Sequence, residues 1–369
     1  MLILLSILAF LVIFTTLILV HEWGHFTAAR KFGVRVEEFG LGLPPLAKVL
    51  TRDRKGTEYT LNWLPLGGFV RMKGEDTHDS KLLKAKDSFA AKAVWQRIII
   101  VCAGVTMNLI TGFVLLTLVF SLGSTYLVAP DKIDAMLVEK VGSELISKNR
   151  LGILINDISA DSPAKATDLK KFDFIAAIDG KKIDQTKEFA EYVQSKKGQA
   201  VQLSVLRRNY EFPVTVTVGA DGKLGVAISD ALTAVQLRYP VHLAVVEGGK
   251  ETFRITKLIV FALGDLGRSI FRAEIPKDIG GPIAIAKETF YRATDIIALI
   301  NFAAMLSLTL AVFNILPIPA LDGGRLIFLL YEAITRQRPS PSMEAKIHAA
   351  GFIFLIGLII LISFKDIFG

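Results

Sequence analysis

The chain has 369 residues, of which 52% are hydrophobic and 21% charged, and its formal net charge is +8. This composition is too apolar for an ordinary soluble protein yet leaves enough charge for aqueous parts, so it predicts a mixed membrane and soluble architecture. The basic residues cluster beside apolar stretches, where orientation in a membrane accounts for them, so we expect no nucleic-acid partner. The single cysteine, Cys102, excludes an internal disulfide and a cysteine metal site.

Four apolar stretches are long enough to cross a bilayer, whose hydrocarbon core needs about 20 helical residues. The first lacks a basic leader and is too long for the apolar core of a signal peptide, so we expect it to be retained. The fourth is the shortest, and its ends are the least defined. In chain order, the expected spans are residues 2–29, 98–128, 296–316 and 349–363.

The loop between the first two spans carries far more basic than acidic residues. The positive-inside rule therefore predicts that this loop is cytoplasmic, and four spans then place both termini outside. The linker between the third and fourth spans is also basic, and it falls inside in this arrangement. The long segment 130–295 is consequently expected on the extracytoplasmic side.

The outer segment has the pattern of a small α+β domain, because alternating strand-like runs flank a helical run at 186–197. Residues 161–183 contain Ser162, Pro163, Ala164, Asp173, Asp179 and Gly180. Through these residues the segment resembles a PDZ domain of the kind found in bacterial proteases, although Asp168 and Phe172 stand where that pattern usually has glycines. A PDZ groove binds an extended peptide, such as a C-terminus, by strand addition, whereas a domain that only blocks access sterically is the open alternative.

Segment 251–271 combines large apolar residues with regularly spaced charges, which argue against a fifth span. A helix lying in the outer membrane interface fits this pattern, and a plain amphipathic surface helix is the alternative. We therefore expect the first part of a membrane core at 1–128, the PDZ-like domain at 129–230, an interfacial segment at 231–294 and the second part of the core at 295–369.

The motif HEWGH at residues 21–25 lies near the inner end of the first span. Its histidines are four residues apart and project from one helical face, close enough to ligate one zinc ion, and Glu22 beside them is a candidate general base. Ionisable side chains inside a span are energetically costly and indicate function. His21 lies nine residues before Arg30, or about 13 Å along the helix, just inside the cytoplasmic face. The alternative is that both histidines only form hydrogen bonds between helices.

A catalytic zinc site needs a third protein ligand and one open position. Asp322, which follows the third span, is the candidate. Pro317 and Pro319 disrupt the helix before it, and unwound backbone at membrane depth is tolerated only where protein covers it or where it lines a wet cavity. The first and third spans run in the same direction, so His21, His25 and Asp322 are expected in the same leaflet. A role as a helix cap or turn residue is the alternative for Asp322.

Six motifs follow one another along the chain: HEWGH, residues 64–75, residues 102–108, the PDZ-like stretch, residues 280–287 and residues 313–325. In their order and spacing they resemble the bacterial site-2 protease family, of the type that regulates sigma-E, over nearly the whole chain. The resemblance implies an intramembrane zinc metalloendopeptidase of the bacterial cytoplasmic (inner) membrane, with one Zn2+ per chain held by His21, His25 and Asp322. It also implies that Glu22 takes a proton from water and returns it to the leaving amine. Members of this type often have two tandem PDZ domains, whereas this chain has room for one.

The loop after the first span has β-prone residues on both sides of Gly67 and Gly68, which predicts a hairpin. A transmembrane helix hides its peptide carbonyls, so a substrate must be held extended, and a strand edge can do this. The resemblance assigns such a loop to substrate clamping at the membrane. We expect Gly67, Gly68 and Phe69 to bind substrate, together with Asn314 and Pro317 near the metal. The alternatives are a hairpin that packs only on its own protein and a helix-end cap at Asn314.

The expected fold is a polytopic α-helical membrane protein with four transmembrane helices, a membrane-associated β-hairpin and one inserted extracytoplasmic PDZ-like α+β domain. The expected function is cleavage of transmembrane segments of single-span membrane proteins near the cytoplasmic face, with membrane lipid as the other partner. By resemblance, an anti-sigma factor or signal-peptide remnants are the substrates. A membrane zinc transporter and a non-catalytic PDZ adaptor are the alternatives. The polar groups lie at one depth without an internal repeat, which argues against the transporter, and Glu22 argues against the adaptor.

Overall fold

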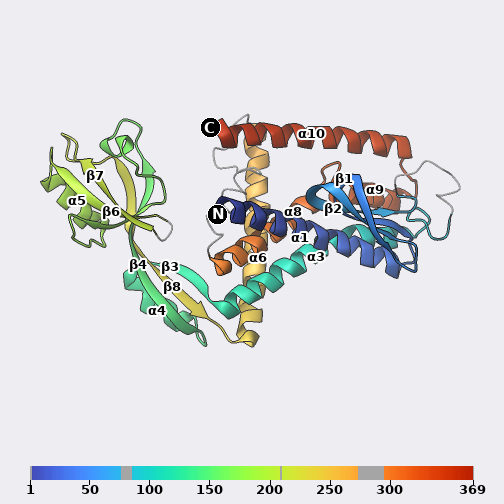
Figure 1. Cartoon of the computed structure of the whole chain (residues 1–369), viewed down its shortest axis with the longest axis horizontal. Coiled ribbons are helices and arrows are strands. Elements are labelled where there is room, and N and C mark those ends of the chain that lie inside the picture. Colours follow the sequence, from blue (N-terminus) through green and yellow to red (C-terminus); the bar gives the residue numbers. More distant parts are fainter. Residues whose placement is uncertain (1, 76–84, 208–209, 273–294, 369) are drawn as a thin grey trace. The chain divides into compact units, whose positions relative to one another are not determined.

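The chain forms two structural units, which we call the helical unit and the sheet unit. The helical unit is made of residues 1–118 and 246–369, and the sheet unit of residues 119–245. The predicted motif at 280–287 lies outside the described residues. In the computed structural model of the chain, the described residues are 2–75, 85–207, 210–272 and 295–368 (Figure 1).

Four helices among the described residues are long and apolar enough to cross a membrane, in agreement with the four predicted spans in number and order. Their ends differ from the prediction. The second helix stops at Leu122, because Gly123 takes a φ of +140° and the apolar residues after it continue as a strand. The fourth begins earlier than predicted, with Pro341 in its first turn. The helices are α1 (Leu2–Lys31), α3 (Val94–Leu122), α8 (Ile296–Ile315) and α10 (Pro341–Phe368).

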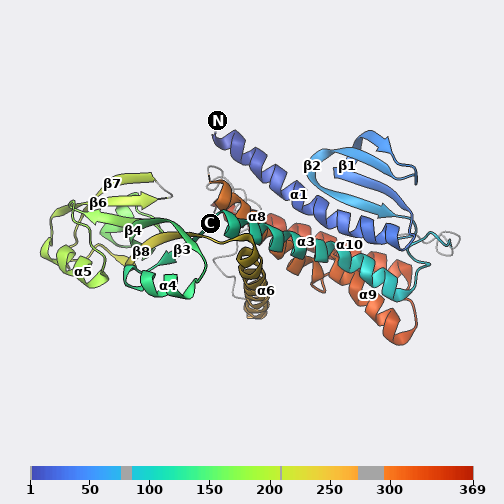
Figure 2. The ribbon, with the colours of Figure 1, turned by 90° about the horizontal axis from the view of Figure 1, so that it is seen from below.

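Helices α1 and α3 run side by side in the helical unit (Figures 1 and 2). Gly24 allows their close approach, because a β-carbon at this position would lie 2.4 Å from the carbonyl oxygen of Ala103. Around this crossing, Phe26, Ile100 and Leu329 belong to one buried apolar cluster. The two helices that carry the first two predicted spans are therefore packed backbone to backbone near HEWGH.

The predicted hairpin is present as the antiparallel strands β1 (Val36–Arg52) and β2 (Glu58–Met72). The first residues of β1, 36–41, pair on one side with 58–61 and on the other side with 68–72. Residues 68–72 are therefore an outer strand of this small sheet. The far half of the hairpin exposes apolar side chains such as Trp63, which is 71% exposed. Its association with the membrane stays a prediction.

Two further helices complete the described part of the helical unit. Helix α9 (Asp322–Thr335) follows α8 after a short loop, and α6 (Val241–Phe271) begins in the sheet unit. On α6, Ile255 is buried in a cluster with Leu116 and Leu308, whereas Phe253 is exposed. This helix is not among the four candidate spans, and its position in the membrane interface stays a prediction.

The sheet unit contains a six-stranded antiparallel sheet in the order β3-β8-β4-β5-β6-β7. Its core combines alternate strand residues such as Ile155 and Leu203 with Phe189 and Val193 from one face of α5. The predicted helix and strand runs are thus present. The elements are β3 (Ser124–Val128), η1 (Pro130–Lys132), α4 (Ile133–Glu139), β4 (Glu144–Ile158), η2 (Pro163–Ala166), β5 (Phe174–Ile178), α5 (Thr186–Ser195), β6 (Ala200–Arg207), β7 (Tyr210–Thr217) and β8 (Val226–Arg238).

The two residues that depart from the PDZ-like glycine pattern have different local roles. Phe172 has a φ of +71°, which is the left-handed conformation that a glycine adopts readily. Asp168 instead forms an ion pair with Arg207, whose guanidinium also binds the buried carboxylate of Asp173. The chain therefore keeps the glycine-like backbone at Phe172 and uses the side chain of Asp168 as an ionic contact.

Candidate metal centre

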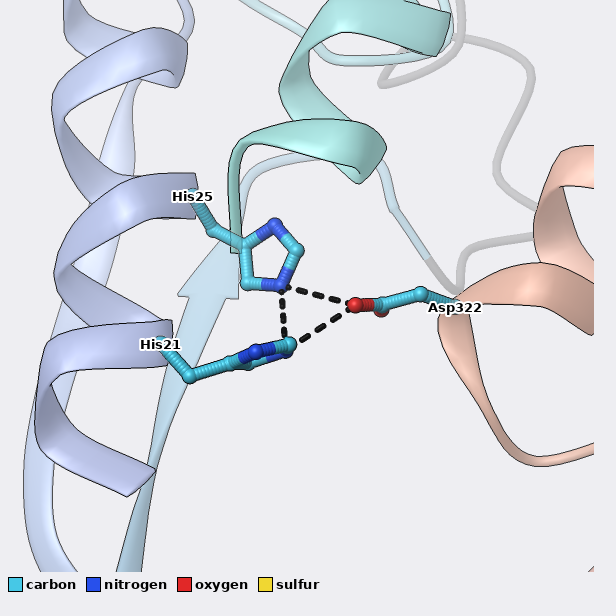
Figure 3. A group of neighbouring side chains, drawn as sticks. All are labelled: His21, His25 and Asp322. Carbon is cyan, nitrogen blue, oxygen red and sulfur yellow. Dashed lines mark hydrogen bonds and ion pairs between the residues drawn. The ribbon is translucent and has the colours of Figure 1, made fainter. Parts of the chain in front are cut away.

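Three side chains from two distant parts of the sequence meet in the helical unit (Figure 3). His21 and His25 project from one face of α1, and Asp322 is the first residue of α9. Nε2 of His21 lies 3.1 Å from Nε2 of His25 and 2.9 Å from Oδ2 of Asp322, and the remaining distance, from His25 Nε2 to that oxygen, is 3.2 Å. Both histidines are 7% exposed, so these atoms are shielded from bulk water.

The three atoms have the spacing that one tetrahedral zinc ion requires. Zinc bonds of about 2.0–2.1 Å in a tetrahedron separate neighbouring ligand atoms by about 3.3 Å, close to the observed distances. Oδ2 of Asp322 is buried without a hydrogen bond of proper geometry, as expected for an atom that serves as a ligand. Burial would raise the pKa of Asp322, but the neighbouring histidines outweigh burial and lower the pKa well below its usual value. The residues present therefore fit a zinc ion.

Hydrogen bonds behind the imidazoles fix their orientation. Nδ1 of His25 donates to the carbonyl oxygen of Ile100 at 2.8 Å, which leaves the Nε2 lone pair facing Asp322. Nδ1 of His21 lies 3.2 Å from the amide of Asn108, a fully buried residue of α3. The oxygen and nitrogen of an amide have nearly the same shape, and exchanging them lets Oδ1 of Asn108, which has no other partner, accept from His21. Each histidine then presents Nε2 to the metal.

Gly104 on α3 provides the space in which both imidazoles lie. A β-carbon at this position would be 2.4 Å from Nε2 of His25 and 2.7 Å from Nε2 of His21. No side chain fits there without moving the candidate ligands. Asn108 and Gly104 were not predicted as site residues. For Asn108 the sequence does contain a signal, because a polar residue inside an apolar span indicates function.

The segment before Asp322 leaves helical geometry, as Pro317 and Pro319 predict. Helix α8 ends at Ile315, and Ala320 takes a φ of +78°, which is rare for a residue with a side chain. A β-carbon on Gly323 would lie 2.0 Å from the carbonyl oxygen of Leu316. The turn that aims Asp322 at the histidines is therefore so tight that the next residue must be glycine.

A cavity of about 340 Å³ brings Glu22 together with His25 and Asp322. The carboxylate of Glu22 accepts a hydrogen bond from the backbone of Val70 on the outer strand 68–72. Two residues further, the backbone N–H of Met72 donates to Glu75 at 3.3 Å. The outer edge of the hairpin therefore faces the candidate base.

The five predicted substrate-binding residues lie in different surroundings. Phe69 lines the cavity of Glu22, whereas Gly67 and Gly68 are buried and pack against Ile18 and Leu19 of α1. Their close packing fixes the start of the outer strand beside α1. Their substrate-binding role stays a prediction.

Asn314 and Pro317 lie at the end of α8 and in the loop that follows it. Asn314 is half-buried and Pro317 is exposed, and neither lines the cavity of Glu22. The structure therefore places both residues near the unwound segment without bringing them to the candidate ligands. Their predicted contact with substrate remains a proposal.

A second cavity of about 810 Å³ lies between α9, α10 and the start of α3. Arg325 and Glu75 form an ion pair and line both cavities. Deeper in the larger cavity, the buried Arg97 binds the carboxylate of Glu332 through two hydrogen bonds of 2.6 and 3.0 Å, and Arg338 binds the same carboxylate. Both cavities reach Asp322, so the candidate metal centre borders space large enough for an extended peptide and water.

Comparison with known proteins places the whole chain in one family. The model of peptidase family M50 matches residues 9–358. A Clostridium perfringens protein described as a candidate zinc metalloprotease is 34% identical, over 97% of each chain. The regulator of sigma-W protease RasP of Bacillus subtilis is 27% identical, over 98% of each chain.

Among solved structures, the chain is similar to the PDZ domain of an SdrC-like protein from Listeria monocytogenes. The identity is 22% and the TM-score is 0.20, and the match covers 22% of this chain and 93% of that domain. The family match and the full-length relatives carry the assignment: the chain belongs to peptidase family M50, which confirms the prediction of a zinc metallopeptidase of the site-2 protease family.

Proposed function

We propose that this chain hydrolyses peptide bonds inside the membrane, with His21, His25 and Asp322 holding one zinc ion and Glu22 serving as general base. The observation that carries the proposal is the convergence of three buried ligand atoms within 3.2 Å of one another, beside a cavity that Glu22 lines. A zinc ion in such a site polarises a carbonyl and lowers the pKa of water toward about 7.

Glu22 handles the proton in this reaction. Its carboxylate takes a proton from the water that attacks the scissile carbonyl carbon, and it then delivers this proton to the nitrogen of the leaving amine. The carbon–nitrogen bond breaks, and after the second proton of the water has also passed to the leaving nitrogen the products are a new carboxylate and a new ammonium group. Val70 supports this role, because its backbone hydrogen bond holds the carboxylate of Glu22 at the cavity.

The outer strand 68–72 is the proposed holder of the substrate. Its inner edge pairs with residues 36–41, and the outer edge faces the cavity of Glu22 and Asp322. A substrate segment that adds to this edge lies extended, with its carbonyls accessible to attack. Phe69 contacts the substrate from the cavity wall, and Gly67 and Gly68 keep the strand close to α1.

The proposed substrates are single-span membrane proteins cut near the cytoplasmic face of the bacterial inner membrane. His21 and His25 lie in the second half of the candidate span 7–31, before its basic end at Arg30 and Lys31. A B. subtilis relative is named a regulator of sigma-W protease, so we propose an anti-sigma factor as the substrate, ahead of signal-peptide remnants. The sheet unit then acts outside, by binding a peptide end or by excluding bulky substrates.

The test uses purified full-length chain and a labelled single-span substrate. Glu22→Gln removes the base but none of the ligands, so we expect cleavage to fall at least 10²-fold while zinc content is unchanged. Asp322→Asn weakens the third ligand, so zinc content itself should fall sharply. A zinc chelator should stop cleavage by the unmodified chain.

Each part of the proposal has its own contradicting result. Full activity of Glu22→Gln would show that another group is the base. Unchanged zinc content in Asp322→Asn would remove Asp322 from the ligand set. Zinc movement across the membrane of sealed vesicles without cleavage would show that the chain is a transporter and not a protease.

A further inference from the structure

The last helix, α10, touches the segment that carries the third ligand at two points one turn apart. The backbone N–H of Ala320 donates to Nδ1 of His348 at 2.8 Å. Gly351 is buried, and a β-carbon there would lie 2.4 Å from Cβ and 2.6 Å from the carbonyl oxygen of Pro319. Helix α10 therefore holds the two residues that stand three and two positions before Asp322.

The backbone at Ala320 needs such support. A φ of +78° is strained for any residue with a β-carbon, and the strain persists only when surrounding contacts enforce it. Pro319 fixes the preceding φ, and the hydrogen bond to His348 fixes the peptide plane between Pro319 and Ala320. The strained turn is thus clamped from the side of α10.

His348 also contacts the segment after Asp322. Its ring lies 5.6 Å from the ring of Phe328, which is on α9 six residues beyond the ligand. His348 therefore contacts both the loop before Asp322 and the helix α9, which begins with Asp322. The same side chain lines the larger cavity together with Asp322.

We propose that His348 and Gly351 are positioning residues for the metal: through them, α10 fixes the strained turn at Ala320 and thereby sets where Asp322 meets the two histidines. The inference rests on the proposed zinc site. It assigns a function in metal binding to a helix that supplies no ligand.

The experiment measures the zinc affinity of full-length chain by chelator competition, together with the visible spectrum of the Co2+-loaded protein, which reports ligand geometry. His348→Ala removes the acceptor and Gly351→Ala forces Pro319 to move, so each should lower zinc affinity about tenfold and change the spectrum. His348→Asn can place an amide oxygen where Nδ1 was, and it should bind zinc like the unmodified chain.

Gly357→Ala is the matched control, because position 357 is on the same helix and a β-carbon there meets nothing within 4 Å. Both glycine substitutions raise helix propensity equally, so the difference between them reports the contact with Pro319. A zinc affinity and spectrum unchanged in His348→Ala, or an equal loss in His348→Asn, would overturn the proposal. If Gly351→Ala is not recovered folded, the two His348 variants decide.

The design separates this inference from the proposed function. Zinc bound once per chain by the unmodified protein and lost in Asp322→Asn establishes the site. If that result fails, the proposed metal site is wrong. If it holds while His348→Ala and Gly351→Ala bind zinc like the control, only the role of α10 is wrong.

Discussion

At the scale of single residues, Gly104 must be a glycine for both imidazoles of the candidate centre to fit beside α3. We expect Gly104→Ala to abolish stoichiometric zinc binding, because the added methyl group would overlap both Nε2 atoms. Metal analysis of the purified protein measures this. Gly112→Ala on the same helix is the control for a clash away from the histidines, since its β-carbon would lie 2.4 Å from the side chain of Leu308 and 3.4 Å from the carbonyl oxygen of Ala304. Equal zinc content in the two variants would show that the histidines do not meet beside α3.

The candidate ligands His21, His25 and Asp322 could be proposed from the sequence because each of the two motifs that carry them is local. Two histidines four positions apart share a helical face wherever the helix lies, and two prolines break a helix in any context. Asn108 and Gly104 could not be assigned a role in this way. Their importance comes from the crossing of α1 and α3, which depends on tertiary packing between segments about 80 residues apart.

At the scale of elements, the length of the apolar stretches predicts the membrane helices, and β-propensity predicts the hairpin. Neither property predicts where these elements end. The predicted second span ran on to residue 128, because Leu127 and Val128 are as apolar as a membrane helix. In the structure they belong to β3, whose partner is β8. The apolar character of a residue does not show whether lipid or a neighbouring strand covers it. The end of the second helix therefore cannot be predicted without knowledge of the tertiary structure.

The ion pair between α3 and α9 predicts how the helical unit responds to acid. Burial would raise the pKa of Glu332, but hydrogen bonds from Arg97 and Arg338 outweigh burial and hold the pKa below its ordinary value. A depressed pKa means that the pair stabilises the fold above the unfolded-state pKa of about 4.3 and that this stability is lost as pH falls through the lower, folded-state pKa.

We therefore expect the thermal unfolding temperature of detergent-solubilised chain to fall between about pH 5 and pH 3, and to fall less in Glu332→Gln. At pH 7 the free energy of unfolding of the same variant should be lower by about 3 kcal/mol, since Arg97 is left buried with a neutral partner. Glu191→Gln, at an exposed site on α5, is the control. Identical acid profiles for Glu332→Gln and the unmodified chain would contradict this account.

At the scale of the whole molecule, the sequence predicts a division into membrane and aqueous parts because composition changes along the chain. The structure separates residues 119–245, with their own apolar core, from the helices that carry His21, His25 and Asp322. All three candidate ligands thus lie in one unit although the sheet unit interrupts it in sequence. Substitutions in the sheet unit can therefore be made without changing any of the three candidate ligands.

The predicted topology decides where in the membrane the bond is cut. The basic loop with the hairpin is expected inside and the sheet unit outside, so we expect the candidate metal ligands near the cytoplasmic face. Because Cys102 is the only cysteine, Cys102→Ser gives a cysteine-free chain into which single reporters can be placed. Lys55→Cys marks the exposed β1–β2 turn, and Lys197→Cys marks the exposed turn that follows α5.

In intact cells, a membrane-impermeant maleimide should label Lys197→Cys, whereas Lys55→Cys should react only after the inner membrane is permeabilised. The cysteine-free chain measures background, and both reporters must support cleavage so that labelling describes a working enzyme. The reverse pattern would place His21 and His25 near the outer face. An anti-sigma factor cut there would release its fragment to the wrong side for transcription, so the labelling pattern tests the proposed substrate class as well as the topology.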